Sequence, residues 1–303
     1  MMKILLIGKN GQVGWELQRT LAPLGEVVVV DYPEINLADE SDTRSWVRRV
    51  APEVIVNAAA YTAVDKAESE ADLAMAINGT APGVLAEEAR ALGAALIHFS
   101  SDYVFDGTKG AAYIESDATN PINVYGLSKL AGDQNVQQVD GDYLILRTTW
   151  VYSVRQGGFV RKVLEWAHSN PGLRIVSDQV GSPTWARALA EVTAQVLAMG
   201  YTDLSGWLAD RKGLYHLGGR GAVSRLDWAR KILELDPHPE GQVVKEIGAA
   251  LTSEFPTPAT RPLYSPIDCT LFADTFGICL PDWEHSLRLA MDLLYEVIEP
   301  FQK

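Results

Sequence analysis

Residues 3–14 read KILLIGKNGQVG, and this stretch predicts the strand, turn and helix around which the chain is built. Its first six residues form an apolar run that is typical of a strand buried on both faces of a parallel sheet. Three glycines with G-x-x-G-x-x-G spacing follow: Gly8, Gly11 and Gly14. Residues 16–24 then have the periodicity of a helix, which Gly25 would end.

A glycine turn in this place predicts a site for the pyrophosphate of a dinucleotide. Glycines between a strand and a helix allow a tight turn and let the backbone approach the phosphates, whose charge the helix N-terminus stabilises. Such turns also serve plain strand-to-helix connections, so the motif is weak when it stands alone. Its position directly after the first strand makes the cofactor interpretation strong.

The ends of the next two predicted strands extend this site. Asp31 follows the strand at residues 26–30, where a carboxylate can accept hydrogen bonds from a ribose and repel a 2′-phosphate. This favours NAD over NADP, and the alternative is a turn aspartate. The strand at residues 53–57 ends in small residues that let a flat ligand approach the backbone. The cofactor contacts predicted in these loops are Gly8, Asn10, Gly11, Gln12, Val13, Gly14, Asp31, Asn36, Leu37, Ala58, Ala60, Tyr61 and Thr62.

Tyr125 and Lys129 form a second motif, because four-residue spacing places both side chains on one face of a helix. A nearby cation stabilises a phenolate and lowers the pKa of the tyrosine, which makes it a proton donor for a carbonyl oxygen. A pair on a solvated helix surface is the plain alternative. The strand at residues 95–100 would bring Ser101 to the same sheet edge, while His98 lies within that strand and is expected to be a core histidine.

Composition excludes several classes of protein. The 303 residues carry a net charge of −13, which argues against nucleic acid or an anionic membrane as a partner. Two cysteines, Cys269 and Cys279, indicate neither a disulfide framework nor a metal site. No signal peptide and no apolar run of membrane-spanning length is apparent, so we expect a cytoplasmic protein.

The second half of the chain predicts a smaller lobe. Strands are expected at residues 142–147, 173–176 and 213–217, and helices at 157–168, 185–199, after Ser224, and from about 283 to 301. We therefore predict an α/β fold: a Rossmann-type doubly wound parallel sheet at residues 1–150, and a smaller α/β substrate lobe at residues 151–303. Some segments of the second half are expected to return to the first domain. No internal repeat is apparent.

Taken in order, the motifs resemble those of the extended short-chain dehydrogenase/reductases. More narrowly, the chain resembles the dTDP-4-dehydrorhamnose reductase family. The resemblance rests on residues 8–14 (GKNGQVG), 62–68 (TAVDKAE), 101–107 (SDYVFDG), 120–126 (NPINVYG), 147–152 (RTTWVY), 178–184 (DQVGSPT) and 261–262 (RP). These segments span nearly the whole chain.

The resemblance implies a reaction and a site. It implies reduction of the C4 ketone of a dTDP-sugar, dTDP-4-dehydro-β-L-rhamnose, by NADH or NADPH, in a monomer or homodimer. The implied catalytic residues are Tyr125 as proton donor, Lys129 to lower its pKa and hold the nicotinamide ribose, and Ser101 on the ketone. The implied substrate contacts are Ser101, Asp102, Trp150 and Arg261. For Trp150 the alternative is core packing, and for Arg261 it is a surface ion pair.

Two positions depart from the family pattern. Ser101 stands where the family usually has threonine, which retains the hydroxyl with fewer restrictions on its rotamer. Arg187 stands where some members have a carboxylate that binds magnesium at a dimer contact. An arginine cannot ligate a cation, so we predict no metal.

Two rival functions remain open. One is a nucleotide-sugar epimerase or dehydratase of the same superfamily, which needs acid–base residues beyond Tyr125; no added glutamate pair stands beside Ser101. The other is a non-catalytic regulatory subunit that resembles the β subunit of methionine adenosyltransferase. Intact Ser101, Tyr125 and Lys129 favour an enzyme.

Overall fold

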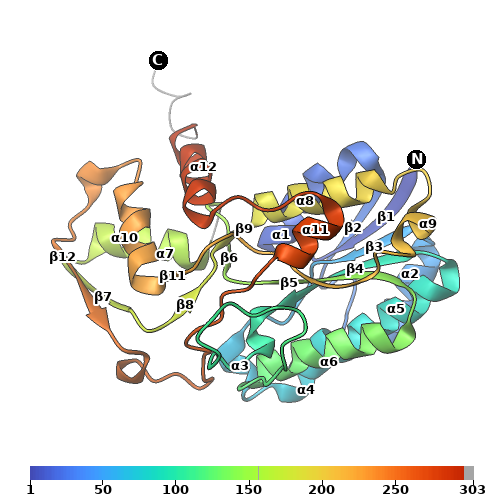
Figure 1. Ribbon diagram of the computed structural model, residues 1–303, viewed down its shortest axis with the longest axis horizontal. Coiled ribbons are helices and arrows are strands. Elements are labelled where there is room, and N and C mark those ends of the chain that lie inside the picture. Colours follow the sequence, from blue (N-terminus) through green and yellow to red (C-terminus); the bar gives the residue numbers. More distant parts are fainter. Residues whose placement is uncertain (156, 297–303) are drawn as a thin grey trace.

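The computed structural model describes residues 1–155 and 157–296, and a six-stranded parallel sheet is its centre (Figure 1). The strand order is β10-β5-β4-β3-β1-β2. The strands are β1 (Met2–Ile7), β2 (Gly25–Val30), β3 (Val54–Asn57), β4 (Ala95–Ser101), β5 (Asp142–Thr148) and β10 (Gly213–His216). The order reverses between β1 and β3, because β2 lies on one side of β1 and the later strands lie on the other, so the predicted doubly wound α/β fold is confirmed.

Alternate residues of the central strands face two separate cores. In β1, Ile4 and Leu6 belong to the core on one face, and Leu5 and Ile7 belong to the core on the other. Figure 1 shows α1 (Gln12–Thr20) and α8 (Ala186–Met199) covering one face and α5 (Ala81–Leu92) and α6 (Val124–Val139) covering the other. A strand that is apolar on both faces therefore lies where both faces are covered by helices.

The helices follow the predicted segments, with differences at their ends. The others are α2 (Glu40–Val50), α3 (Val64–Ala67), α4 (Ala71–Met75), α7 (Gly158–Ser169), α9 (Leu204–Leu208), α10 (Arg225–Glu234), α11 (Thr270–Phe276) and α12 (Trp283–Glu296). α1 starts at Gln12, four positions before the predicted Glu16, because Gly11 provides its extended N-cap. A short π-helix at residues 76–80 joins α4 to α5. The predicted end of the last helix, residues 297–301, lies outside the described residues.

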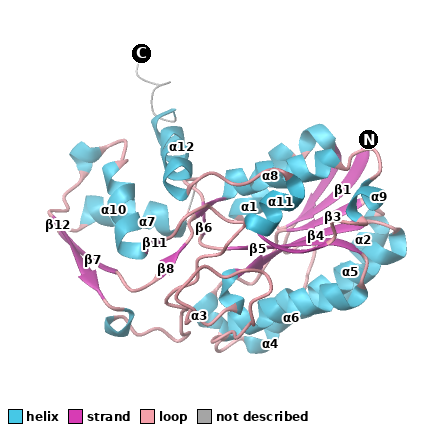
Figure 2. Ribbon diagram, viewed as in Figure 1, coloured by secondary structure: helices cyan, strands magenta, loops and turns pink. Residues whose placement is uncertain are grey.

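The smaller lobe is made of short strand pairs and two helices, and Figure 2 shows it to one side of the large sheet. Its pairs are β7 (Gly172–Val176) with β12 (Glu246–Ala250), and β8 (Val180–Gly181) with β11 (Val223–Ser224), packed with α7 and α10. A third pair, β6 (Val151–Tyr152) with β9 (Thr184–Trp185), lies between the lobes. Several elements from beyond residue 150 lie with the large sheet: β10 pairs with β5, α8 packs on α1, α9 packs on β5 and α11 packs on β10.

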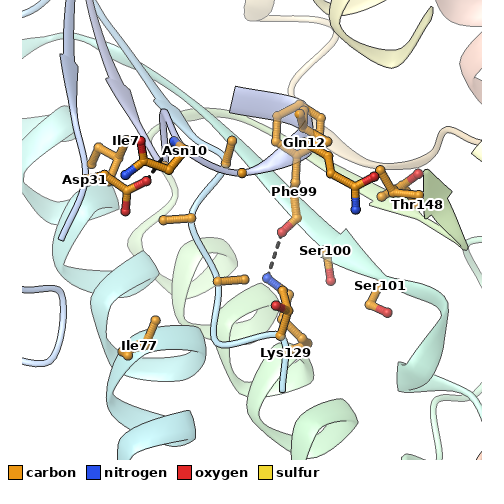
Figure 3. A pocket seen from close by; sticks show the side chains of 18 of the residues that line it. Ile7, Asn10, Gln12, Asp31, Ile77, Phe99, Ser100, Ser101, Lys129 and Thr148 are labelled. Atoms are coloured by element: carbon orange, nitrogen blue, oxygen red, sulfur yellow. Dashed lines mark hydrogen bonds between the residues drawn. The ribbon is translucent and has the colours of Figure 1, made fainter. Parts of the chain in front are cut away.

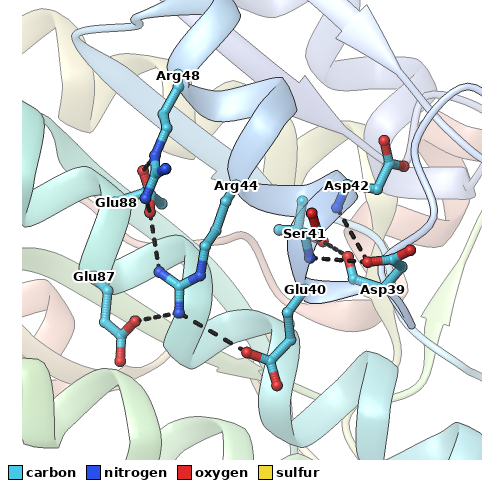
Figure 4. A network of polar contacts seen from close by, with 9 residues as sticks. Asp39, Glu40, Ser41, Asp42, Arg44, Arg48, Glu87 and Glu88 are labelled. Carbon is cyan, nitrogen blue, oxygen red and sulfur yellow. Dashed lines mark hydrogen bonds and ion pairs between the residues drawn. The ribbon is translucent and has the colours of Figure 1, made fainter.

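Ion pairs join α2 to α5 on the face of the sheet that these two helices cover (Figure 4). Arg44 pairs with Glu88 at 2.9 Å and with Glu87 at 2.6 Å, and Arg48 pairs with Glu88 at 2.6 Å. Glu88 is buried, so two guanidinium groups satisfy its carboxylate and lower its pKa. Asp39 caps α2 by accepting hydrogen bonds from the backbone N–H groups of its first turn.

No helix within residues 1–155 and 157–296 is long and apolar enough to cross a membrane.

Candidate active site

The glycine turn lies against the end of β3, and its close contacts leave no room for side chains. Gly8 has φ +98°, and a Cβ on it would lie 2.6 Å from the backbone nitrogen of Ala59. A Cβ on Gly14 would lie 1.9 Å from the carbonyl oxygen of Gly8. The turn therefore brings the N-terminus of α1 close to the loop after β3, as a phosphate site requires.

A cavity of about 590 Å³ opens at the carboxyl ends of the central strands (Figure 3), and we call it the central cavity. Most of the predicted site residues line it: Gly8, Asn10, Gly11, Gln12, Val13, Asp31, Asn36, Leu37, Ala58, Ala60, Thr62, Ser101, Asp102, Tyr125, Lys129 and Trp150. Gly14, Tyr61 and Arg261 do not line it. The sheet edge at which the strand order reverses thus gathers residues that are as far apart in the chain as Gly8 and Trp150.

Three polar atoms at the central cavity fit a polar ligand such as a dinucleotide. Gln12 Oε1, Ser100 Oγ and Thr148 Oγ1 are buried, and none has a hydrogen-bond partner among the described residues; the same holds for Thr149 Oγ1, of another lining residue. A buried polar atom without a partner is costly, so a ligand that bonds these atoms gains affinity. Together with the glycine turn, they fit a nicotinamide dinucleotide.

Asp31 lies at one end of the central cavity, and backbone groups hold its carboxylate. It accepts hydrogen bonds from the backbone N–H groups of Asn10, at 2.9 Å, and Tyr32, at 2.8 Å. Glu34 lies beside it and pairs with Lys9 at 2.6 Å. Two carboxylates and one ammonium group therefore surround the place where the sequence predicts an adenosine ribose.

Tyr61 lies beside the central cavity, but its side chain is engaged elsewhere. Its hydroxyl donates to Glu70, which raises its pKa to about 12. Its backbone exchanges two hydrogen bonds with the side chain of Asn78, at 2.8 and 3.0 Å. Asn78 also donates to Ser128 of α6, so it ties the cofactor loop to the catalytic helix. No sequence motif singled out Asn78, which lies in the short π-helix between α4 and α5.

Tyr125 lies in the first turn of α6, and Asn123 fixes that turn by accepting a hydrogen bond from the Gly126 N–H at 2.7 Å. Its ring packs edge-to-face on Tyr103, with centroids 5.5 Å apart. Burial raises the pKa of Tyr125, and the nearby Ser101 hydroxyl partly offsets this effect. The pKa of Tyr125 is therefore raised, and the lowering of this pKa that was expected from Lys129 is not the net result.

Lys129 lies one helical turn after Tyr125 and is buried. Its Nζ donates to the carbonyl oxygen of Phe99 at 2.7 Å, as Figure 3 shows. Burial lowers the pKa of Lys129 to about 8, and the carboxylate of Asp133 acts in the opposite direction. An ammonium group thus lies at the floor of the cavity with few partners in the protein.

Ser101 and Asp102 leave the end of β4 side by side. The Ser101 hydroxyl donates to Asp102 Oδ1 at 3.2 Å, and the Ser265 hydroxyl donates to Asp102 Oδ2 at 2.6 Å. Asp102 is 2% exposed, and burial raises its pKa to about 6. The sequence pointed to Asp102, but Ser265 reaches it from a loop 163 positions away.

Trp150 forms a wall of the central cavity in a backbone conformation that is rare outside glycine, with φ +42°. Gly181 lies against its ring, where a Cβ would be 2.4 Å from Trp150 Cε2. The Arg225 guanidinium carbon lies 3.5 Å from the centroid of the same ring. Trp228 stacks on Trp150 with centroids 5.6 Å apart. Backbone and packing thus fix the indole at the border of the two lobes.

The two arginines near this wall differ in their partners. Arg261 donates to both carboxylate oxygens of Asp65, at 2.6 and 2.7 Å, so its charge is already paired. Arg225 stacks on Trp150, and no acceptor in residues 1–155 or 157–296 bonds its guanidinium. Sequence reasoning missed Arg225, because a single arginine at a helix start carries no motif.

A metal site is not apparent in the described part of the chain. No group of three or more His, Cys, Asp or Glu side chains there is placed to hold an ion. Arg187, the position that departs from the family pattern, pairs with Glu191 at 3.0 Å.

Comparison with known proteins gives one consistent result. The family model described as RmlD substrate binding domain matches residues 2–296. A dTDP-4-dehydrorhamnose reductase of Burkholderia thailandensis is 43% identical over 297 residues, which cover 97% of this chain and 99% of the relative. These likenesses extend over both lobes.

Two solved structures have the same architecture. A dTDP-4-dehydrorhamnose reductase from Clostridium acetobutylicum superposes with a TM-score of 0.88 at 35% identity, covering 97% of this chain and 100% of the other. One from Bacillus anthracis, in complex with NADP, superposes with a TM-score of 0.86 at 31% identity and the same coverage. The second structure binds a cofactor of the kind that the glycine turn predicts.

Proposed function

The chain belongs to the dTDP-4-dehydrorhamnose reductase family, and from this premise we propose how its residues reduce the C4 ketone of dTDP-4-dehydro-β-L-rhamnose to give dTDP-β-L-rhamnose. The observation that carries the proposal is the meeting of Tyr125, Lys129 and Ser101 in one cavity with the glycine turn. When bound there, NADH or NADPH supplies the hydride. The protein must then bind, orient and supply a proton.

Tyr125 supplies the proton to the C4 oxygen. Reduction needs a protonated donor at the start of the reaction, and the raised pKa of Tyr125 keeps its phenol loaded at neutral pH. The Ser101 hydroxyl, at the end of β4, can donate its one proton to the same oxygen, as negative charge develops on it, by turning away from Asp102. Both groups come from rigid elements, so the ketone is held in one orientation.

Lys129 stabilises the phenolate that Tyr125 becomes after it has donated its proton. Its ammonium lies one helical turn from Tyr125 and is buried, where a charge acts more strongly than in water. Phe99 takes only one of its three hydrogens, which leaves donors for the ribose of the cofactor. Lys129 is therefore proposed both to stabilise the phenolate and to hold the ribose.

The sugar nucleotide is proposed to bind at the border of the two lobes. Trp150 and Asp102 line the central cavity on this side. We propose that Arg225 offers its guanidinium to the diphosphate, since it lacks a protein acceptor in the described residues. Arg261 is a second proposed contact, although it would have to share its charge with Asp65.

The test is turnover. Purified protein given dTDP-4-dehydro-β-L-rhamnose should oxidise NADH or NADPH with one-to-one stoichiometry, and dTDP-rhamnose should appear in the product. Absence of turnover with both cofactors, together with retained NADPH binding, would contradict the proposal and favour a non-catalytic regulatory subunit. Release of an epimer or a dehydrated sugar without net cofactor oxidation would favour the epimerase or dehydratase alternative.

Two further proposals concern location and assembly. We propose that the protein works in the cytoplasm, where nucleotide sugars and reduced dinucleotides are found, as a monomer or homodimer. A fractionation experiment and light scattering at several concentrations test these two proposals.

A further inference from the structure

A buried histidine lies directly beside the catalytic lysine. His98 is 0% exposed and Lys129 is 1% exposed, and their Nε2 and Nζ atoms are 3.5 Å apart. His98 belongs to β4, beneath the central cavity, and Asn57 of β3 lies opposite it in the sheet register. Sequence reasoning treated this residue as a core histidine with no function.

The hydrogen bonds around Asn57 decide which nitrogen of His98 carries a proton. Asn57 Oδ1 accepts from the backbone N–H of Ala59 at 3.2 Å, so the amide nitrogen Nδ2 is the end that faces His98 Nδ1, at 3.2 Å. Nδ2 is a donor, and His98 Nδ1 must therefore accept. Burial and the charge of Lys129 lower the pKa of His98 well below its usual range, so the ring is neutral and its proton lies on Nε2.

This tautomer has a consequence for Lys129. A protonated Nε2 cannot accept a hydrogen bond, and an ammonium can only donate. The 3.5 Å contact therefore places two donors face to face. Of the three hydrogens on Lys129, one goes to Phe99 and none can go to His98. No acceptor among the described residues takes the remaining two, and Lys129 lines the central cavity.

We propose that His98 is a positioning residue whose protonated Nε2 denies Lys129 a partner in the core and so directs two of its hydrogens toward the cofactor and Tyr125. The inference rests on the proposed role of Lys129, not on the identity of the sugar substrate. Asn57 and Ala59 take part because they set the tautomer, and Ala59 is also the residue against which Gly8 packs.

The other charged groups near Lys129 are consistent with this arrangement. Asp133, one turn further along α6, raises the pKa of Lys129. Its Oδ2 accepts from Arg147 at 2.9 Å, and its buried Oδ1 has no hydrogen-bond partner among the described residues, so Lys129 does not bond it. Tyr125 is neutral at physiological pH because burial raises its pKa. His98, on β4, is therefore a neighbour of Lys129 whose tautomer depends on the orientation of the Asn57 amide.

Two substitutions separate this role from simple packing. His98→Gln places an amide near the position of Nε2, and its oxygen can accept a hydrogen from Lys129. We expect about a tenfold rise in KM for NADPH and about a tenfold fall in kcat, because one charged hydrogen bond is diverted into the core. His98→Leu offers no acceptor. We expect smaller changes in kcat and in KM for NADPH, per folded molecule, than for His98→Gln, and a lower Tm because Asn57 loses its partner.

A packing role predicts the opposite order. Glutamine can bond Asn57 and would then be the milder substitution, whereas leucine would be the more damaging one. If His98→Gln has the higher kcat and the lower KM for NADPH of the two variants, the proposal is overturned. Both values are referred to the folded fraction measured by thermal unfolding.

A direct measurement does not depend on activity. The chain has five histidines, so a protein labelled with ¹⁵N only at histidine gives a small set of ring signals, and the His98→Gln variant identifies those of His98. We expect a protonated Nε2 and an unprotonated Nδ1 between pH 6 and 8. A protonated Nδ1 overturns the proposal even if the enzyme reduces the expected sugar. Conversely, an expected tautomer with no sugar turnover would count against the proposed function alone.

Discussion

Arg261 and Asp65 are 196 positions apart in the chain and are joined by two parallel hydrogen bonds of 2.6 and 2.7 Å. Asp65 belongs to α3, beside the cofactor loop, and Arg261 belongs to residues 257–268, which we call the returning segment. The same segment bonds Asn123 through the Thr260 carbonyl and Asp102 through Ser265. A strip of the second half of the chain is thus fastened to the first lobe beside Tyr125.

The ion pair predicts a measurable coupling between Arg261 and Asp65. Arg261→Gln and Asp65→Asn should each lower stability, and the double variant should lose less than the sum, with a coupling of about 1 kcal/mol for a partly solvated bidentate pair. Because Arg261 lowers the pKa of Asp65, the coupling should be present at pH 7 and disappear as pH falls through that lowered pKa. Urea unfolding at pH 7 and at successively lower pH measures it, and additive losses at pH 7 would contradict it.

Tyr125→Phe should remove the proton donor and keep the edge-to-face packing on Tyr103. We expect kcat to fall about 10²–10⁴-fold, which is the usual contribution of a positioned general acid. Binding of NADPH, measured by fluorescence titration, should change little. Near-normal turnover of this variant would mean that another group supplies the proton.

Cofactor preference should depend on the charges beside the glycine turn. Asp31→Ala removes a carboxylate that repels a 2′-phosphate, and Glu34→Gln releases the Lys9 ammonium, which now pairs with Glu34 at 2.6 Å. Each change should shift the kcat/KM ratio toward NADPH, by about tenfold, since a nearby charge at a partly solvated site contributes on this order. Glu53→Gln, at the opposite end of the sheet, serves as a control. An unchanged ratio for both variants would leave Asp31 as a turn residue only.

The fold followed from local sequence because both of its signals are local. Continuous apolar strands and glycines at fixed spacing arise within a dozen residues, and the structure places them as predicted. The family likewise followed from short motifs, and the comparisons confirm it. The start of α1 was wrong by one turn, because the first turn, at residues 12–15, carries the glycine motif and not the apolar periodicity by which the helix was predicted.

Contacts between distant segments could not be predicted from the sequence. The partner of Arg261 is in α3, the hydroxyl on Asp102 comes from Ser265, and the tautomer of His98 depends on Asn57. Each is a contact between segments that approach one another only in the folded protein. Tyr61 illustrates the same limit, since the loop was predicted but the direction of its side chain was not.

Asp102 predicts an unusual dependence of stability on pH. Its pKa is raised from 3.8 to about 6 in the folded protein, so ionised Asp102 destabilises the fold above pH 6, and this penalty is absent below the unfolded pKa. Asp102→Asn should therefore raise the free energy of unfolding by about 1–3 kcal/mol at pH 8 and by little at pH 4. Thermal unfolding across this range measures it. A loss of stability at pH 8 would show that Ser101 and Ser265 need a carboxylate.

The last prediction concerns the wall formed by Trp150. A Cβ at Gly181 would lie 2.4 Å from Cε2 and 2.7 Å from Nε1 of the indole, and Arg225 and Trp228 pack against the same ring. Gly181→Ala should therefore displace the indole, whose backbone is already in the left-handed region. We expect a rise of about tenfold or more in KM for the sugar nucleotide, with the KM for NADPH nearly unchanged.

Gly172→Ala is the matched control for this substitution. Gly172 begins β7 in the same lobe, and a Cβ on it would meet no atom within 4 Å. The same added methyl group should leave both KM values and the Tm close to those of the parent. An atom placed 2.4 Å from Cε2 of the indole must move either the ring or β8. If Gly181→Ala behaves like Gly172→Ala, the predicted displacement of the indole is wrong. Only movement of the ring reaches the central cavity, so a normal KM would assign the adjustment to the strand.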